Sequence, residues 1–399
     1  MPSGIEITEG RTRLLVPEAH SLHGPGTRTG DVFFNEQMAF GRDVTVMLLR
    51  ALEKKDITVA DAMSATGSRA VRVANEVSGT MVTANDVDPK AIPYIEHNIA
   101  LNSLSNCVPS NRDLHVLFSG SSFDYVDVDP FGSPVPFIQS AIRGCRKKGI
   151  LAITATDTAP LAGAQAGKCR RRYQSEPIRG YMCHESGLRI LMCNIAKELA
   201  KFDRGMRPLL SFYTDHYFRV YVQVEEGAAP TDRSLGQIGF LHYDPDTLER
   251  SVSECQDDLH DKGPFWIGPL HDKKLLARMN ASDMEKEKRC VKMLNLWRNE
   301  LDDQVFLYDV SELSSFTKMS PPKIEVLIEV LNSVGRTAPT HMSPTSFKTE
   351  LNTEEVIAIY KEHSPDAQNN VGSQEGKKKD FLYPLKRVPK GSVEGGRGV

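Results

Sequence analysis

An acid, a proline and an aromatic ring stand together at Asp129-Pro130-Phe131, directly after the apolar stretch from Tyr125 to Val128. The stretch indicates a buried strand that stops at the proline, which cannot donate to a sheet ladder. Because ligands of open α/β sheets bind at the carboxyl ends of the strands, we expect these residues to line a ligand site. The carboxylate and the proline carbonyl could accept two N–H bonds from an amine, and the ring could stack on a planar base. Taken alone, the tripeptide could equally be an Asp-Pro turn.

More acids occur where the pattern places a strand end. Asp61 precedes the loop from Ser64 to Arg69, and Asp86 and Asp113 end the second and third predicted strands. The loop is neither Gly-x-Gly-x-x-Gly nor a P-loop, which disfavours dehydrogenases and P-loop nucleotidases. An acid after the second strand can bind both ribose hydroxyls, a third can reach an adenine amine, and one near the loop can meet an ammonium. S-adenosylmethionine fits these carboxylates, although each acid could instead be a helix cap or a turn residue.

Strands alternate with helices from residue 57 to residue 156, which predicts a parallel, doubly wound α/β sheet. The expected strands are 57–61, 80–86, 124–129 and 149–156, with a short segment reaching 113 and a closing pair at 209–213 and 217–225. Alternating apolar residues before Val16 predict an N-terminal hairpin, and the helix-helix-loop order near the C-terminus predicts a smaller α+β, winged-helix-like domain. We expect the acidic stretch 244–261 to be helical.

The segment Gly227-Ala-Ala-Pro230 interrupts the pattern, so we place a boundary there. Four parts result: an N-terminal hairpin and loop extension at 1–30, the main α/β domain at 31–228, a C-terminal domain at 229–363, and a basic tail at 364–399. The low complexity of the tail predicts disorder. The loop from Gly24 to Gly30 could become ordered when substrate binds.

Composition limits the class of protein. The chain has 399 residues, of which 25% are charged and 40% hydrophobic, and it has neither a signal peptide nor an apolar run of membrane-spanning length. Seven cysteines, never spaced as Cys-x-x-Cys, predict reduced thiols and a cytoplasmic protein. A net charge of −3 means that any nucleic acid must be bound by local basic patches. The strongest candidates are Arg170, Arg171 and Arg172 with Tyr173, although such a run is often only a solvated face.

At this point the residues resemble those of a known family, the tRNA (guanine-26, N2)-dimethyltransferases. The resemblance spans most of residues 5–360 and depends on the stretches Glu9–Gly10, Val32–Asp43, Asp61–Arg69, Ala84–Asp86, Asp127–Pro134, Thr154–Asp157, Cys169–Tyr173 and Gly268–Leu270. It implies a Rossmann-like class I methyltransferase domain with a family-specific, tRNA-binding C-terminal domain. The implied reaction transfers a first and then a second methyl group from S-adenosylmethionine to the exocyclic amine of guanine 26 in tRNA.

The resemblance also implies roles for single residues. Asp129 and the Pro130 carbonyl would hold the guanine N2, while Phe33 and Phe131 would sandwich the base. Asp129 could also accept the released proton. The residues that match cofactor contacts, or neighbour them, are Arg42, Arg69, Asp86, Val87, Asp113 and Leu114.

The chain departs from many members of the family in one respect, because it lacks their cysteine-paired zinc site. The corresponding region holds Cys255 with His242, His260 and His271 scattered around it, so we expect no structural zinc. We expect a monomer that needs no protein partner. Two alternatives stay open: an amino-methyltransferase acting on ribosomal RNA, DNA adenine or a protein glutamine, and a catalytically silent RNA-binding module.

Overall fold

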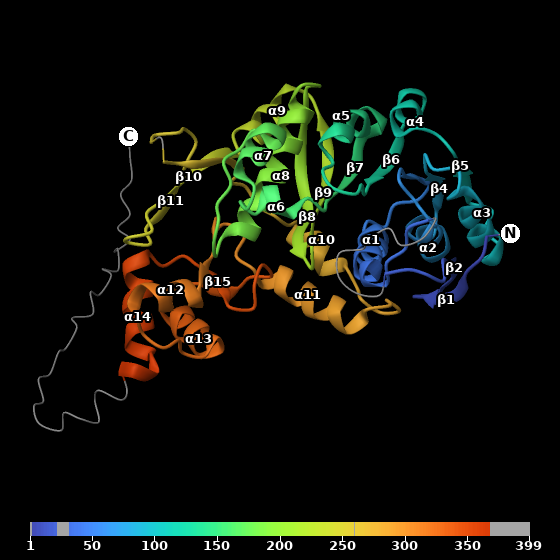
Figure 1. Ribbon diagram of the computed structural model, residues 1–399. Helices are drawn as coiled ribbons and strands as arrows, with labels where there is room; N and C mark the ends of the chain where they lie inside the picture. The colour runs from blue at the N-terminus through green and yellow to red at the C-terminus, as the bar shows by residue number, and fades with distance from the viewer. Residues whose placement is uncertain (1, 22–31, 259, 368–399) are drawn as a thin grey trace, which may run out of the picture.

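A seven-stranded sheet forms the centre of the protein in the computed structural model, which describes residues 2–21, 32–258 and 260–367. Its strand order is β5-β4-β3-β6-β7-β9-β8 (Figure 1). The first five of these strands are parallel, and β9 and β8 close the sheet in antiparallel pairing. The predicted doubly wound sheet and its closing pair are therefore confirmed. The bounds are β3 (Ile57–Asp61), β4 (Thr80–Asn85), β5 (Cys107–Ser110), β6 (Phe123–Val128), β7 (Cys145–Ala155), β8 (Arg204–Thr214) and β9 (Tyr217–Glu226).

Two hydrophobic cores flank the sheet, because neighbouring residues of a strand point to opposite faces. Val126 and Leu151 face one core, whereas Tyr125 and Ile150 face the other. The first core is completed by α4 (Leu114–Gly120), α5 (Val135–Gly144) and α8 (Cys183–Ala200). The second is completed by α1 (Ala39–Ala51), α2 (Ser68–Glu76) and α3 (Ile92–Leu101). Burial on both faces explains why these strands are almost continuously apolar.

The N-terminal hairpin is also confirmed. It pairs β1 (Ile5–Glu9) with β2 (Thr12–Val16) in antiparallel register, with Ile5 opposite Val16. Leu14 and Val16 pack with Phe34 and with Val71 of α2 in a small cluster. The hairpin is thereby attached to the helices beside the sheet.

The region after the sheet differs from the prediction in two places. The expected boundary forms a helix, α9 (Ala228–Leu235), because a proline near a helix start costs no intrahelical hydrogen bond. The stretch 244–261 is not helical: β11 (Arg250–Ser253) pairs with β10 (Ile238–Tyr243), which also pairs with β12 (Lys262–Trp266). The Asp244 side chain accepts hydrogen bonds from the Asp246 amide and the Thr247 hydroxyl, so it forms a turn where the charge pattern indicated a helix.

The segment up to residue 307 shares the cores of the sheet. Leu241 and Phe265 join the core on the α8 side, and Trp297 joins the core on the α1 side. The helices of this segment are α10 (Lys273–Arg278) and α11 (Glu287–Asn299). Most of the buried apolar residues that follow form a separate core with Leu248, although Met342 packs in the core on the α8 side.

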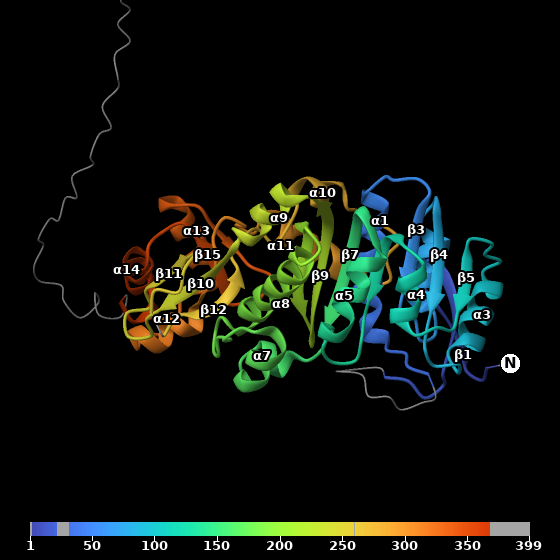
Figure 2. The ribbon, with the colours of Figure 1, turned by 90° about the horizontal axis from the view of Figure 1, so that it is seen from above.

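That last module lies at the end of the molecule away from the N-terminus (Figure 2). It comprises β13 (Tyr308–Asp309), α12 (Val310–Thr317), α13 (Ile324–Val334), β14 (Thr337–Pro339), β15 (Ser346–Thr349) and α14 (Thr353–His363). The sequence predicted a helix-helix-loop order for this region, and in the structure the two helices α12 and α13 are followed by the paired strands β14 and β15. The loop 24–30 and residues 368–399 of the tail lie outside the described residues. No helix in the described ranges is long and apolar enough to cross a bilayer.

Candidate functional site

A cavity of about 570 Å³ opens where β3, β4 and β6 reach their carboxyl ends. Another hollow, of about 660 Å³, lies beside β5 around Thr58 and Arg146 and contains none of the residues expected in the active site. The first cavity contains all of those predicted for catalysis and cofactor binding: Phe33, Arg42, Asp61, Arg69, Asp86, Val87, Asp113, Leu114, Asp129, Pro130 and Phe131.

Asp129 follows β6 directly and is bound by an arginine. Arg69, on α2, donates to Asp129 Oδ2, donates to Thr45 Oγ1 at 3.0 Å and lies 3.7 Å from Asp127. The chain then turns through Pro130, whose carbonyl oxygen lies 3.5 Å from the Thr156 hydroxyl. The carboxylate and this carbonyl are thus two acceptors at the same edge of the cavity.

Asp61 ends β3 and is almost inaccessible, with 3% of its surface exposed. Within the described residues its Oδ2 atom has no hydrogen-bond partner. Burial raises the pKa of Asp61 to about 7, and the negative charges of Asp127 and Asp129 add to the effect. A buried carboxylate oxygen without a donor favours a cationic ligand, so the ammonium role predicted for Asp61 fits this position.

Asp86 and Asp113 line the cavity and also hold local structure. Asp86 Oδ2 accepts from the Ala65 amide of the glycine-bearing loop at 2.7 Å. Asp113 does not end the third strand, as the sequence suggested, because β5 stops at Ser110. It is the N-cap of α4, where its side chain accepts from the His115 amide at 2.8 Å. A cap and a ligand contact are compatible, because a carboxylate can accept several hydrogen bonds.

The two residues expected to add backbone contacts differ in their exposure. Val87 is 66% exposed, whereas Leu114 is buried at the start of α4.

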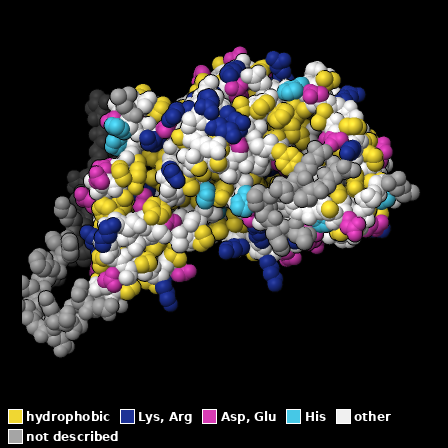
Figure 3. Space-filling model, viewed as in Figure 1, with side chains coloured by type: hydrophobic (Ala, Val, Ile, Leu, Met, Phe, Trp, Pro, Cys, Tyr) yellow, Lys and Arg dark blue, Asp and Glu magenta, His cyan; other side chains and the backbone are white. Residues whose placement is uncertain are grey.

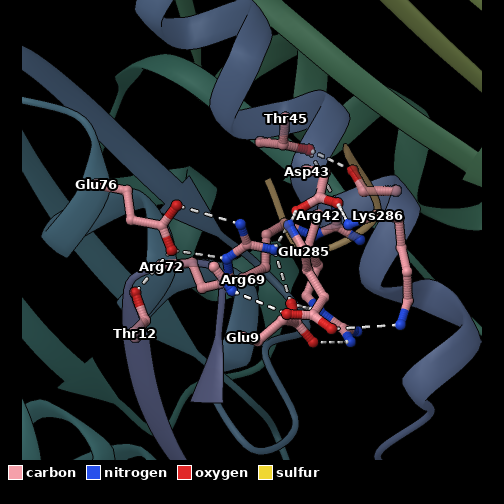
Figure 4. A network of polar contacts seen from close by, with 12 residues as sticks. Glu9, Thr12, Arg42, Asp43, Thr45, Arg69, Arg72, Glu76, Glu285 and Lys286 are labelled. Carbon is pink, nitrogen blue, oxygen red and sulfur yellow. Dashed lines mark hydrogen bonds and ion pairs between the residues drawn. The ribbon is translucent and has the colours of Figure 1, made fainter. Parts of the chain in front are cut away.

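Arg42 belongs to a buried network of charges behind the cavity wall (Figure 4). Its guanidinium donates to both carboxylate oxygens of Glu9, at 2.7 and 2.6 Å, and to the Asn35 carbonyl at 3.1 Å. Arg72 donates to Glu9 at 2.8 Å and pairs with Asp43 at 2.7 Å. Asp43 in turn accepts from the backbone amides of Glu285 and Lys286, just before α11.

Phe33 and Phe131 meet at the cavity, with ring centroids 4.7 Å apart and planes at 82°. This edge-to-face arrangement leaves no slot for a base between the rings. A parallel sandwich requires one ring to turn, and Phe131, which is 65% exposed, is the freer of the two.

Sequence reasoning missed part of the site. Asp127 is fully buried and accepts from Tyr125 at 2.7 Å and from Arg219 of β9 at 3.0 Å. Arg219 stands between the alternating apolar residues Phe218 and Val220, where a polar residue is ordinary, so nothing in the sequence marked it as buried. The β8–β9 turn also reaches the cavity, with His216 and Tyr217.

The predicted basic patch lies on α7 (Ala166–Tyr173), where Figure 3 shows Lys and Arg side chains gathered. Arg170 pairs with Glu176 at 2.6 Å and Arg172 with Asp157 at 3.0 Å, while Arg171 makes no ion pair with any described residue. Tyr173 is only 1% exposed and its hydroxyl contacts Ser133 and Asp157. Tyr173 therefore supports the helix from inside and is not accessible to RNA.

Another buried cluster involves His271, which looked isolated in the sequence. Potential ligand atoms of His271, Glu300 and His341 lie within 4.8 Å of one another. However, Glu300 already accepts from Thr340 at 2.8 Å and from His341 at 2.5 Å, and Lys348 lies 3.0 Å from it. These protein donors compensate the glutamate charge.

Comparison with known proteins extends the similarity over nearly the whole chain. A family model described as N2,N2-dimethylguanosine tRNA methyltransferase matches residues 10–361. The tRNA (guanine(26)-N(2))-dimethyltransferase of Pyrococcus abyssi is 35% identical over 381 residues, which cover 89% of this chain and 98% of the relative. The protein of the same name from Methanoregula boonei is 39% identical over 361 residues, covering 86% and 95%.

Among solved structures, the complex of Trm1 from Pyrococcus horikoshii with S-adenosyl-L-methionine matches with a TM-score of 0.82 at 33% identity. The match covers 89% of this chain and 99% of that one, so it includes the C-terminal module as well as the sheet.

Proposed function

Because the chain belongs to the N2,N2-dimethylguanosine tRNA methyltransferase family, we propose that it methylates the exocyclic N2 of guanine 26 in tRNA. The product is N2-methylguanosine and then N2,N2-dimethylguanosine. The observation that carries the proposal is the cavity itself, where the Asp129 and Pro130 acceptors share one space with Asp61, whose Oδ2 atom has no hydrogen-bond partner among the described residues.

The cofactor is S-adenosylmethionine, which supplies a methyl group on a positively charged sulfur. The cavity suits it because Asp61, Asp86 and Asp113 provide carboxylates for an ammonium, a ribose and an adenine amine. Arg42 and Arg69 supply donors for its carboxylate, and Val87 and Leu114 lie beside two of the acids. The solved Pyrococcus horikoshii complex holds this compound, which supports the assignment.

Asp129 and the Pro130 carbonyl would accept the two N–H groups of guanine N2. The lone pair of an aromatic amine is delocalised into the ring, and these acceptors restore electron density at nitrogen. Transfer would form an N–C bond, break a C–S bond and release a proton from N2, and the Asp129 carboxylate is the proposed acceptor of that proton. Alignment of the amine with the methyl group contributes much of the rate.

A guanine inside a stem must leave the stack to reach this cavity, at a cost of a few kcal/mol. Stacking on an aromatic side chain stabilises the extruded base by about 1–3 kcal/mol. Phe33 and Phe131 line the cavity, and we assign them this stacking role. The exposed arginines of α7, on the face seen in Figure 3, are the proposed contacts to tRNA phosphates.

We further propose a monomeric, cytoplasmic enzyme. All seven cysteines are free thiols, which supports a reducing compartment. Sedimentation velocity of the purified protein, with and without tRNA, checks the oligomeric state.

The function is tested by nucleoside mass spectrometry of an unmodified tRNA transcript incubated with the protein and S-adenosylmethionine. A matched transcript with adenine at position 26 is the control. We expect dimethylguanosine in the transcript with guanine at position 26 and none in the control transcript. Dimethylguanosine in both transcripts would show that another guanine is methylated. Cofactor binding without any methylated product would refute the proposal that tRNA is the substrate.

A further inference from the structure

Glu9 is a buried acid that none of the proposed chemistry uses. It ends β1 of the N-terminal hairpin, and only 3% of its surface is exposed. Oε1 accepts from Arg42 Nε at 2.7 Å and from Arg72 at 2.8 Å, and Oε2 accepts from Arg42 Nη2 at 2.6 Å. Both oxygens are therefore committed to arginines (Figure 4).

The pair with Arg42 is bidentate, the geometry that fixes a guanidinium most firmly. Arg42 is held further by the Asn35 carbonyl at 3.1 Å and by the Phe34 ring, 4.9 Å from the guanidinium carbon. The hydrogen bonds of Arg42 to Glu9 and Asn35 all use its Nε and Nη2 atoms. Nη1 has no hydrogen-bond partner within the described residues, and Arg42 lines the cavity.

We propose that Glu9 is a positioning residue for cofactor binding, which aims Nη1 of Arg42 into the cavity toward the carboxylate of S-adenosylmethionine. The inference rests on the proposed function, because it takes the cofactor as the ligand of Arg42. It makes the N-terminal hairpin, which lies outside the sheet, a contributor to cofactor affinity.

The charge state of Glu9 suits this role. Burial alone would raise its pKa, but Arg42 and Arg72 outweigh burial and lower the pKa to about 2. The carboxylate is therefore ionised at every pH at which the enzyme would be assayed.

Glu76 provides a matched control in the same network. It is also 3% exposed, accepts from Arg72 at 2.9 and 3.1 Å and from Thr12 at 2.8 Å, and makes no hydrogen bond to Arg42. A change of either glutamate to glutamine removes one buried negative charge beside Arg72. Only the change at Glu9 alters the support of Arg42.

The experiment measures the affinity of S-adenosylmethionine by calorimetry, and kcat and KM with tRNA, for Glu9→Gln and Glu76→Gln. We expect both variants to unfold at lower temperature than the wild type. Glu9→Gln should weaken cofactor binding about tenfold while kcat at saturating cofactor stays within about twofold. Glu76→Gln should keep the wild-type cofactor affinity.

A double-mutant cycle with Arg42→Lys shows whether Glu9 acts through Arg42. The double variant should bind the cofactor no more weakly than Arg42→Lys alone, because the arginine that Glu9 orients is already gone. Additive losses, or equal losses in Glu9→Gln and Glu76→Gln, would overturn the inference.

If Glu9→Gln does not fold, Glu9→Asp keeps the charge and shortens the reach, and its cofactor affinity should fall while that of Glu76→Asp does not. A wild type that binds the cofactor but leaves tRNA unmethylated would refute the proposed function and still allow the Glu9 comparison.

Discussion

Asp129 is the single residue on which methyl transfer should depend most directly. Asparagine has the same shape but presents an N–H where the carboxylate accepts one, and it loses the ion pair with Arg69. We expect Asp129→Asn to lower kcat about 10²–10³-fold, the usual cost of removing one preorganised group. Cofactor affinity should stay within a few fold. Single-turnover assays with labelled S-adenosylmethionine check this, and near-normal turnover would remove Asp129 from the mechanism.

Asp61 should make cofactor binding dependent on pH. With a pKa of about 7 the carboxyl is mostly neutral at pH 6, and a cationic ligand prefers the ionised form. Affinity for S-adenosylmethionine should therefore rise as the pH increases from 6 through 7, and should fall again above about pH 8, where the α-amino group of the cofactor loses its own proton. Asp61→Asn should bind more weakly and lose the rise. Calorimetric titrations at several pH values check it, and a wild-type affinity that is flat with pH would contradict the assignment.

The raised pKa of Asp61 affects folding stability in the opposite direction to cofactor binding. The folded state holds the Asp61 proton more tightly than an unfolded chain, whose aspartate has a pKa near 3.8. Its contribution to stability is therefore fully present below pH 3.8 and is lost as the pH rises through about 7. Ionisation of Asp61 thus makes the folded protein without cofactor less stable in the same pH range in which it strengthens cofactor binding.

At the scale of the residue, the acids of the cavity could be predicted, because an aspartate at or just after the end of an apolar stretch can be recognised in the sequence. The sequence could not predict which donors each acid meets. Asp113 is a helix cap as well as a cavity residue, and Tyr173 faces inward although it follows three arginines. Arg219 reaches Asp127 from a strand remote in sequence, and no local pattern encodes that contact.

At the scale of the element, α7 is the surface that should bind phosphates. Arg170 and Arg172 are engaged by Glu176 and Asp157, whereas Arg171 is not paired with any described residue. We expect Arg171→Ala to raise the KM for tRNA several-fold, leave cofactor affinity unchanged and reduce the salt slope of tRNA binding by about one. Filter binding at several salt concentrations, with Arg233→Ala on α9 as the surface control, measures the slope. An unchanged slope would remove α7 from the interface.

Elements with a strong apolar period were predictable, and those built on local side-chain bonds were not. The strands of the sheet and α8 have buried, periodic apolar residues. The acidic stretch after Tyr243 looked helical by charge, but the hydrogen bonds of Asp244 and the pairing of β10 with β11 decide its structure. These two strands follow one another closely, with Tyr243 opposite Arg250, so the turn at Asp244 determines their pairing and the charge pattern does not.

At the scale of the whole molecule, Lys348 joins the last module to the sheet. It is fully buried on β15 and lies 3.1 Å from Glu185 of α8 and 3.0 Å from Glu300 after α11. Lys348→Met removes the cation that these two buried carboxylates share and leaves Glu185 with Arg189 and Glu300 with the Thr340 and His341 donors, which should cost about 3–5 kcal/mol of unfolding free energy. Urea unfolding of this variant, compared with Lys361→Met on exposed α14, measures the loss. Equal midpoints would show that the junction does not depend on this charge.

The sharing of cores has a consequence for chimeras within the family. A graft that begins at residue 229 would pull Leu241, Phe265 and Trp297 out of the packing around the sheet, so the recipient would lose its own core. A graft that begins at Tyr308 keeps most of the distal core together, but it leaves Leu248 behind and takes Met342 from the core on the α8 side. Any donor module must also bring a cation to the place of Lys348, because the recipient's Glu185 and Glu300 would otherwise lose the cation that they share. Exchange of the distal module therefore requires a matched junction, in which the Lys348 cation and the partner of Arg250, Glu312, are supplied together.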